Sequence, residues 1–133
     1  MNLKSIIFLL LSIVSPYYLN AQDYEFDDQS GNLEIKTREF TKISVIMYKD
    51  YEYKVSFMAD EYVGKVHFKI REDNAGKKVL FDNSTASYSQ EKKIKLENTT
   101  KLLIEVRIPE GLNKSEDAVN KGWVALLIEH RRK

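Results

Sequence analysis

The residues of this chain that could do catalytic chemistry are few. There are two histidines, His67 and His130, and no cysteine, and each histidine lies in an alternating pattern typical of a β-strand. A zinc site needs several Cys or His ligands at short spacing, so a shared site would require the two strands to be neighbours. His67 alternates with Lys65 and Lys69, and we expect both histidines to be surface or half-buried residues.

Other catalytic patterns are missing. The chain has no G-x-S-x-G elbow and no thiol nucleophile, and nothing selects two of its acidic residues as a glycosidase pair. We therefore expect no enzyme, no catalytic residue and no required cofactor. A small hydrolase built on His67 or His130 is the remaining enzymatic hypothesis.

Oxygen-rich turns are the candidates for a calcium site. Asp60, Asp73, Asn74 and Asp82 lie between apolar runs and could offer oxygen ligands to Ca²⁺, although none fits the EF-hand loop. Asp and Asn also favour turns for backbone reasons alone. Both interpretations stay open, with turn formation favoured.

Aromatic side chains are the candidates for ligand binding. Sugar-binding proteins present flat rings that stack on the ligand, and Tyr62, Tyr88 and Trp123 are positioned to do so, with Tyr24 and Tyr48 as further candidates. Trp123 opens an apolar strand, which favours packing in the core over presentation.

The elements that must position these residues are β-strands. Apolar and polar residues alternate with period two in segments 51–57, 65–71, 93–97, 102–108 and 123–129, the pattern of antiparallel strands with one solvated face. Within them, Ile104 is expected to point inward and Glu105 outward, where its replacement should change little. Segment 41–48 is more uniformly apolar and is expected to be covered on both faces.

Further segments complete the predicted domain. Residues 79–81 form a short strand, 112–121 a long loop, and the apolar run 123–129 is expected in the middle of a sheet. With the intervening turns, this predicts an all-β antiparallel sandwich of jelly-roll type, or a partly closed barrel, of about seven to eight strands.

The N-terminus has the layout of a cleavable signal peptide. Lys4 precedes an apolar run over residues 6–14, and Ala21 supplies a small residue at the cut. A retained anchor is the alternative, but crossing a bilayer takes about 20 apolar residues, and this run is shorter. The predicted divisions are a signal peptide (1–21), a flexible acidic segment or first strand (22–36) and the sandwich domain (37–133).

Charge excludes one class of partner. Lys4 is the single charged side chain in residues 1–21, so the remaining basic residues balance the 20 acidic ones. Non-specific nucleic-acid binding needs a basic field, and we therefore expect no nucleic-acid partner.

The strand patterns resemble a known family. Tyr53-Lys54-Val55-Ser56, then Gly64 to Ile70 (GKVHFKI), Leu80-Phe81-Asp82-Asn83, Leu102 to Val106 (LLIEV) and Gly122 to His130 (GWVALLIEH) follow in order. They resemble small secreted proteins of unknown function from Gram-negative bacteria with a pre-peptidase C-terminal-like (PPC-like) β-sandwich. PPC-like domains are usually non-catalytic appendages of secreted enzymes. Because no enzyme domain accompanies the sandwich here, the resemblance implies a partner on another chain.

Together these patterns predict a secreted, non-enzymatic binding module located in the periplasm, on the cell surface or outside the cell, without a retained membrane anchor. A protein partner in the envelope or outside the cell is favoured. A carbohydrate- or polymer-binding module, such as one for a polysaccharide, and a structural subunit of an envelope assembly are the alternatives.

Overall fold

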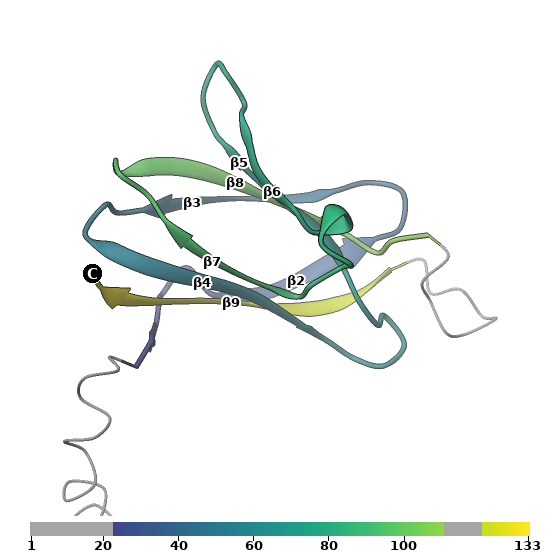
Figure 1. Ribbon diagram of the computed structural model, residues 1–133. Helices are drawn as coiled ribbons and strands as arrows, with labels where there is room; N and C mark the ends of the chain where they lie inside the picture. The colour runs from purple at the N-terminus through teal and green to yellow at the C-terminus, as the bar shows by residue number, and fades with distance from the viewer. Residues whose placement is uncertain (1–22, 111–120) are drawn as a thin grey trace, which may run out of the picture.

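The computed structural model describes residues 23–110 and 121–133, which form nine β-strands and one short 3-10 helix. The strands make two antiparallel sheets packed face to face (Figure 1), so the predicted all-β sandwich is confirmed. The elements are β1 (Glu25–Phe26), β2 (Gly31–Lys36), β3 (Thr41–Met47), β4 (Tyr51–Ala59), β5 (His67–Glu72), β6 (Val79–Asp82), η1 (Asn83–Thr85), β7 (Glu91–Lys95), β8 (Thr100–Arg107) and β9 (Lys121–Arg132).

The first sheet, sheet A, has β9 at its centre, as predicted for the apolar run 123–129. β9 pairs with β4 on one side and with β1 and β2 in succession on the other, and β4 pairs in turn with β7. Between β1 and β2, Asp27 N and Ser30 Oγ donate to the carbonyl oxygen of Ile128 at 2.8 and 3.0 Å. The described domain therefore begins with two strands from the segment 22–36.

The second sheet, sheet B, has the order β3-β8-β5-β6. β3 is one of its two edge strands, and Lys42, Ser44 and Ile46 on its outer face are exposed. The prediction that segment 41–48 is covered on both faces is therefore wrong, because no element packs on the outer side of β3 in the described part of the chain. β5 and β6 shift register between Ile70 and Arg71, which marks a bulge.

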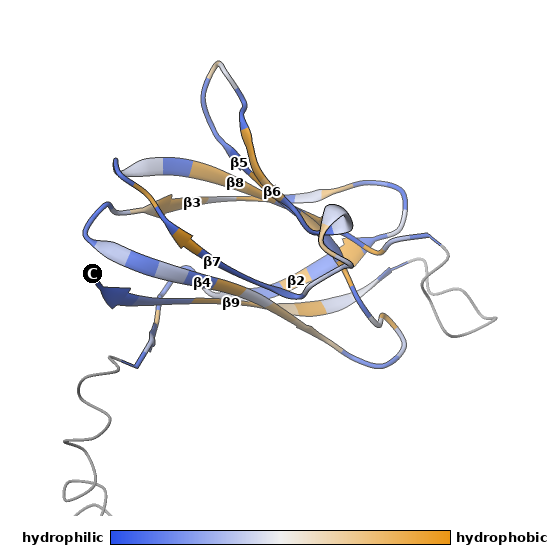
Figure 2. Cartoon of the chain, in the orientation of Figure 1, coloured by the Kyte–Doolittle hydropathy of each residue, from blue (hydrophilic) through white to orange (hydrophobic). Residues whose placement is uncertain are grey.

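The core lies between the sheets and is built by the alternation seen in the sequence. Each inner strand turns every second side chain inward, so apolar bands recur along the ribbons (Figure 2). Ile104 is fully buried, as predicted. The largest fully buried side chains are Tyr53, Phe68, Ile35, Met47, Ile70, Leu102, Ile104, Ile108, Leu126, Ile128, Val45 and Val55.

Two glutamines join the sheets at opposite corners. Gln29, after β1, accepts from Ile46 N at 2.7 Å and donates to Ile46 O at 3.0 Å. Gln90, before β7, accepts from Val66 N at 3.0 Å and donates to Val66 O at 3.0 Å. A side-chain amide carries both a donor and an acceptor. Each glutamine therefore hydrogen-bonds the backbone N–H and C=O of one residue, as a neighbouring strand would.

Asn83 strengthens the corner at Gln90. Its side chain is fully buried, accepts from Phe68 N at 2.9 Å, and donates to Val66 O at 2.8 Å and Ser89 O at 3.0 Å. One side chain thus ties the start of β5 to the loop between β6 and β7.

Two predictions fall on other parts of the chain. The signal peptide and nearly all of the loop 112–121 lie outside the described residues, and Lys121 already belongs to β9. Within the described residues, no helix has the length and apolar character that crossing a bilayer requires.

Candidate binding surface

The outer face of sheet A carries exposed apolar side chains, most of them at the end where β9 begins. Met58 on β4 lies opposite Ala125 on β9, and Trp123 and Leu127 are the next outward residues of β9 on either side. Phe26 on β1 lies opposite Glu129, diagonal to Leu127. Phe26, Met58 and Trp123 are 72%, 64% and 62% exposed. We call these five residues (Phe26, Met58, Trp123, Ala125 and Leu127) the apolar surface.

The other end of the same face is ionic. Lys54 pairs with Glu129 at 3.4 Å, and Arg131 Nε donates to Glu52 at 3.1 Å. Both pairs join β4 to β9 in direct register. The hydrogen bond from Arg131 is the main cause that lowers the pKa of Glu52. We call these four residues the ionic ladder.

Tyr24 covers the ionic ladder. Its ring centre lies 4.4 Å from the Arg131 guanidinium carbon and 4.8 Å from Lys54 Nζ, distances at which cations are attracted to the ring face. Burial, followed by the charge of Glu52, raises the pKa of the Tyr24 hydroxyl. Tyr24 is therefore occupied within the domain rather than presented to a ligand.

His67 lies on the outer face of sheet B, as its alternation predicts, but the expectation of a surface or half-buried residue is wrong. It is 6% exposed, because the rings of Phe40 and Tyr88 pack edge-on against it with centroids 5.3 and 5.9 Å away. Alternation predicts the direction in which a side chain points. It does not predict whether residues from other segments, here Phe40 and Tyr88, bury that side chain.

The hydrogen bonds of His67 define its chemistry. Arg107 Nε donates to His67 Nδ1 at 3.2 Å, which places the proton of the neutral ring on Nε2. Nε2 then donates to Asp82 Oδ1 at 2.9 Å, and Ser84 Oγ donates to the same oxygen at 2.7 Å. In a hydrolase triad the histidine stands between hydroxyl and carboxylate. Here the carboxylate stands between, so His67 is not placed to accept the proton of Ser84.

Asp82 is held in its charged form by these partners. Burial alone would raise the pKa of the carboxyl, but hydrogen bonds from Ser84 and His67 outweigh it and lower the pKa below 3.8. The carboxylate also caps η1 by accepting from Ser84 N at 3.0 Å.

His130 belongs to the other sheet. Its Nδ1 lies 3.1 Å from Asp27 Oδ2 and its ring packs on Tyr51 with centroids 5.0 Å apart. Burial would raise the pKa of the Asp27 carboxyl, but hydrogen bonds from Gln29 and His130 lower this pKa below its ordinary value. The nearby Ser30 is engaged with the backbone of Ile128. His67 and His130 thus lie on different sheets and share no site.

The four calcium candidates are not brought together. Asp60 accepts from Val63 N at 2.9 Å, and Asn74 accepts from Gly76 N at 3.0 Å, both within their own turns. Asp73 forms an ion pair with Lys101 at 3.6 Å, and Asp82 is hydrogen-bonded to His67. Within residues 23–110 and 121–133 no group of three or more His, Asp or Glu is arranged to hold a metal ion. A calcium site therefore stays a prediction.

The three candidate rings do not share one face. Trp123 is exposed on sheet A, so the expectation that it packs in the core is wrong, and Tyr62, 61% exposed, lies in the turn after β4. That turn is close to the start of β9, because a Cβ on Gly122 would lie 2.4 Å from Val63 Cγ2. Tyr88 is half-buried against His67 on sheet B.

Sequence reasoning missed Phe26 and Met58. A signal was present for Met58, because it continues the outward series Glu52, Lys54 and Ser56 with an apolar residue. Similarly, both faces of β9 are apolar from Trp123 to Leu127. Phe26 stands in an acidic segment without alternation, and no comparable signal marks it.

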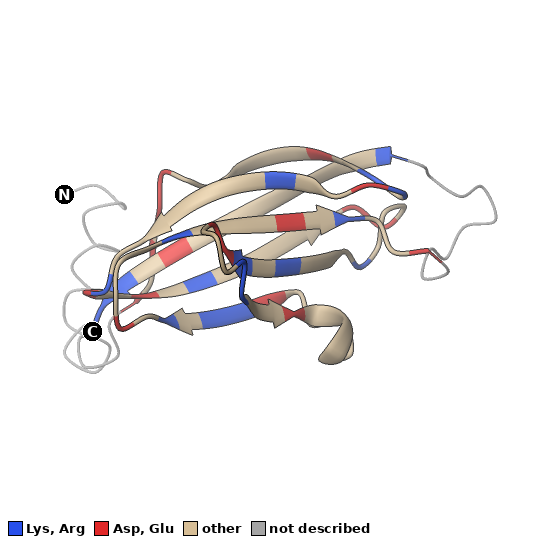
Figure 3. Ribbon diagram, turned by 90° about the horizontal axis from the view of Figure 1, so that it is seen from above, with Lys and Arg blue, Asp and Glu red and all other residues tan. Residues whose placement is uncertain are grey.

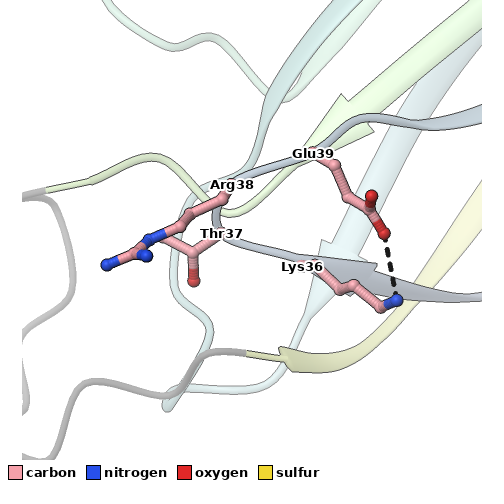
Figure 4. A pocket seen from close by; sticks show the side chains of 4 residues that line it. All are labelled: Lys36, Thr37, Arg38 and Glu39. Atoms are coloured by element: carbon pink, nitrogen blue, oxygen red, sulfur yellow. Dashed lines mark hydrogen bonds and ion pairs between the residues drawn. The ribbon is translucent and has the colours of Figure 1, made fainter.

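The described residues line two hollows, one at each end of the sandwich. One, of about 440 Å³, lies at the β2–β3 turn, where the described lining residues are Lys36, Thr37, Arg38 and Glu39 (Figure 4). Lys36 and Glu39 pair across it at 3.0 Å. The other, of about 350 Å³, is lined by residues Lys49, Asp50, Tyr51, Arg132 and Lys133. Neither is an enclosed apolar cavity.

Comparison with known proteins gives little to identify the chain. No family model and no curated protein sequence matches it. Among solved structures it is similar to the crystal structure of Aeromonas hydrophila PliG, described as a periplasmic lysozyme inhibitor of g-type lysozyme. The identity is 14% and the TM-score 0.45, over 82% of this chain and 92% of that chain. A likeness this distant bears on neither function nor location.

Proposed function

We propose that the domain is an exported, non-enzymatic β-sandwich that binds a protein in the cell envelope or outside the cell. The apolar surface supports this proposal. Met58 and Trp123 project from neighbouring positions of one sheet face, and Leu127 connects them to Phe26, which lies opposite Glu129 on the far side of β9. Contiguous exposed apolar side chains on a soluble domain are typical of interaction sites, since covering them removes apolar area from water.

The chemistry of the apolar surface favours a protein over a polysaccharide. Met58 is a thioether side chain beside Trp123 on a sheet face, and protein interfaces are enriched in methionine and aromatic residues. A sugar binder would instead present several rings to one ligand. Tyr62 and Trp123, both exposed near the start of β9, keep carbohydrate binding as the second candidate.

The arrangement around His67 supports a non-enzymatic role. The histidine is covered by two rings, and its two nitrogens are engaged by Arg107 and Asp82. A general base must reach the proton that it removes. Export is supported by the signal-peptide pattern of residues 1–21 alone.

Capture from native envelopes tests the proposal. Protein of residues 22–133 serves as bait beside two variants, Met58→Lys on the apolar surface and Ile46→Lys as a matched control. Ile46 is an exposed apolar residue of sheet B, and its contacts with Gln29 are made by backbone atoms. We expect one stoichiometric, salt-resistant protein, captured by the wild type and Ile46→Lys but at least about tenfold less by Met58→Lys.

Other results would redirect the assignment. Equal capture by all three baits would remove the apolar surface from the interface. If no protein is captured while a polysaccharide array is bound, and Trp123→Ala abolishes this binding, the domain is a carbohydrate binder. A defined homo-oligomer in solution would favour the structural-subunit alternative.

A further inference from the structure

One edge of sheet A is β7, and the other is formed by β1 and β2. β7 pairs with β4 on one side, and no described element pairs with its other side. Phe57 N donates to Gln90 O, so the opposed pair of Phe57 and Gln90 is hydrogen-bonded. Because bonded and non-bonded pairs alternate in antiparallel strands, the backbone groups of residues 91, 93 and 95 point to the free edge.

Part of this edge is already closed. The Ser89 hydroxyl donates to Glu91 O at 3.0 Å and accepts a longer hydrogen bond of 3.4 Å from Glu91 N. Lys93 and Lys95 have no such cover in the described part of the chain. An unpaired edge of this kind is able to accept a further strand.

The edge carries positive charge. Lys92, Lys93 and Lys95 lie within five residues, and Figure 3 shows this basic stretch on the strand. Lys92 Nζ lies 4.8 Å from the centre of the Phe81 ring and Lys93 Nζ lies 6.0 Å from that of Tyr24. Neither has a carboxylate within ion-pair distance among the described residues, and Lys95 has only a long contact of 3.9 Å to Glu52.

The neighbouring carboxylates are already engaged. Glu52 accepts a hydrogen bond from Arg131, and Glu91 lies 3.8 Å from Lys54. Because Ser89 already covers residue 91, two copies of β7 would have to pair through residues 93 and 95, which places Lys93 opposite Lys95 and is unfavourable. A strand of opposite charge meets no such penalty.

We propose that the β7 edge binds an extended acidic segment of a partner protein by strand addition. The segment's backbone bonds with Lys93 and Lys95, and carboxylates at alternate positions lie beside those two ammonium groups on the outer face. The intervening side chains face Ile94 and Phe81, which are apolar. This site is separate from the apolar surface and does not depend on it.

The test is a titration of isotope-labelled protein, residues 22–133, with an end-capped peptide that alternates valine and glutamate over six residues. We expect backbone amide shifts centred on residues 93 and 95. Three probes accompany it: the same peptide with lysine for glutamate, the peptide N-methylated at its glutamate amides, and a sulfated oligosaccharide. The lysine and N-methylated peptides should fail to shift these amides.

Variants separate this site from the apolar surface. Lys93→Glu with Lys95→Glu should weaken binding at least about tenfold, since two favourable charge pairs become repulsive. Lys42→Glu, on the exposed face of β3, and Met58→Lys should leave peptide affinity unchanged. Thermal unfolding of each variant verifies the fold.

Three results would overturn the proposal. The first is a set of amide shifts that does not include β7. The second is an N-methylated peptide that binds as tightly as the unmodified one, which would show that no strand is added. The third is a lysine peptide that binds as tightly as the glutamate peptide. If the N-methylated peptide still binds and the sulfated oligosaccharide displaces it, the lysines form a general binding site for polyanions.

Discussion

Replacing Asn83 by alanine should destabilise the domain strongly, although the residue is polar and lies in a loop region. The change removes the acceptor of Phe68 N and the donor to Val66 O and Ser89 O. Val66 O keeps Gln90 Nε2 at 3.0 Å, and Ser89 is exposed to water. The Phe68 amide, in contrast, is left buried without a partner.

The magnitude follows from these separate losses. A buried unsatisfied amide costs roughly 1–3 kcal/mol, and a lost hydrogen bond whose acceptor finds another partner costs about 1 kcal/mol or less. We therefore expect a loss of about 3 kcal/mol in the free energy of unfolding. For a domain of this size, the corresponding fall in melting temperature is on the order of 10 °C.

Urea unfolding followed by circular dichroism measures this value. Asn98→Ala is the matched control, because Asn98 is exposed and only its backbone oxygen is bonded, to Thr100 Oγ1. The control should stay within about 0.5 kcal/mol of the wild type. A loss below about 1 kcal/mol for Asn83→Ala, with an unchanged denaturant slope, would show that Asn83 does not hold this corner.

Three further changes have expected outcomes. Ile104→Ala should lower the free energy of unfolding by roughly 2–5 kcal/mol, and thermal unfolding like that of the wild type would contradict its inward position. Glu105→Ala should cost about 1–2 kcal/mol in urea unfolding, because Glu105 is 5% exposed and its carboxylate lies 2.8 Å from the buried Nε of Arg71, whose side chain as a whole is 24% exposed; a value near zero would show the ion pair to be unimportant. Asp82→Asn should make stability less sensitive to acid: the folded-state pKa of Asp82 lies below 3.8, so its stabilisation is present above that pH and is lost as pH falls through the folded value. Stability measured between about pH 5 and pH 3 should fall more steeply for the wild type than for the variant, and parallel curves would exclude this role.

The inner strands could be predicted from the sequence because each buries one face. Tyr53, Val55 and Phe57 alternate with polar residues, and burial makes that alternation necessary. Edge strands were harder. β3 has one exposed face despite its apolar sequence, since being at an edge is a property of the assembled sheet.

Side chains that depend on distant loops could not be predicted. Glu105 was expected to point outward and to be replaceable, but it is buried beside Arg71 on the neighbouring strand. Its direction was predicted correctly, and the ion pair was not. The corner contacts of Gln29 and Gln90 likewise join residues 17 and 24 positions apart, and no local pattern marks them.

The apolar surface was only partly visible in the sequence. Trp123 was singled out as an aromatic residue, but its exposure depends on its place on the outer side of β9. Tyr88 was selected on the same grounds and packs on His67. Residue type alone does not separate these two cases, because both rings are amphipathic.

The central place of β9 sets the order in which the chain can acquire structure. β1, β2 and β4 all pair with residues 121–132, so sheet A has no middle until this segment has been synthesised. Before that, the pair of β4 and β7 is the part of sheet A that can form among the described strands. An isolated two-stranded ribbon has only marginal stability in water. The nascent chain therefore stays without its sandwich until residues 121–132 have been synthesised, and a chain without its sandwich is narrow enough to pass through a pore that the folded domain could not enter.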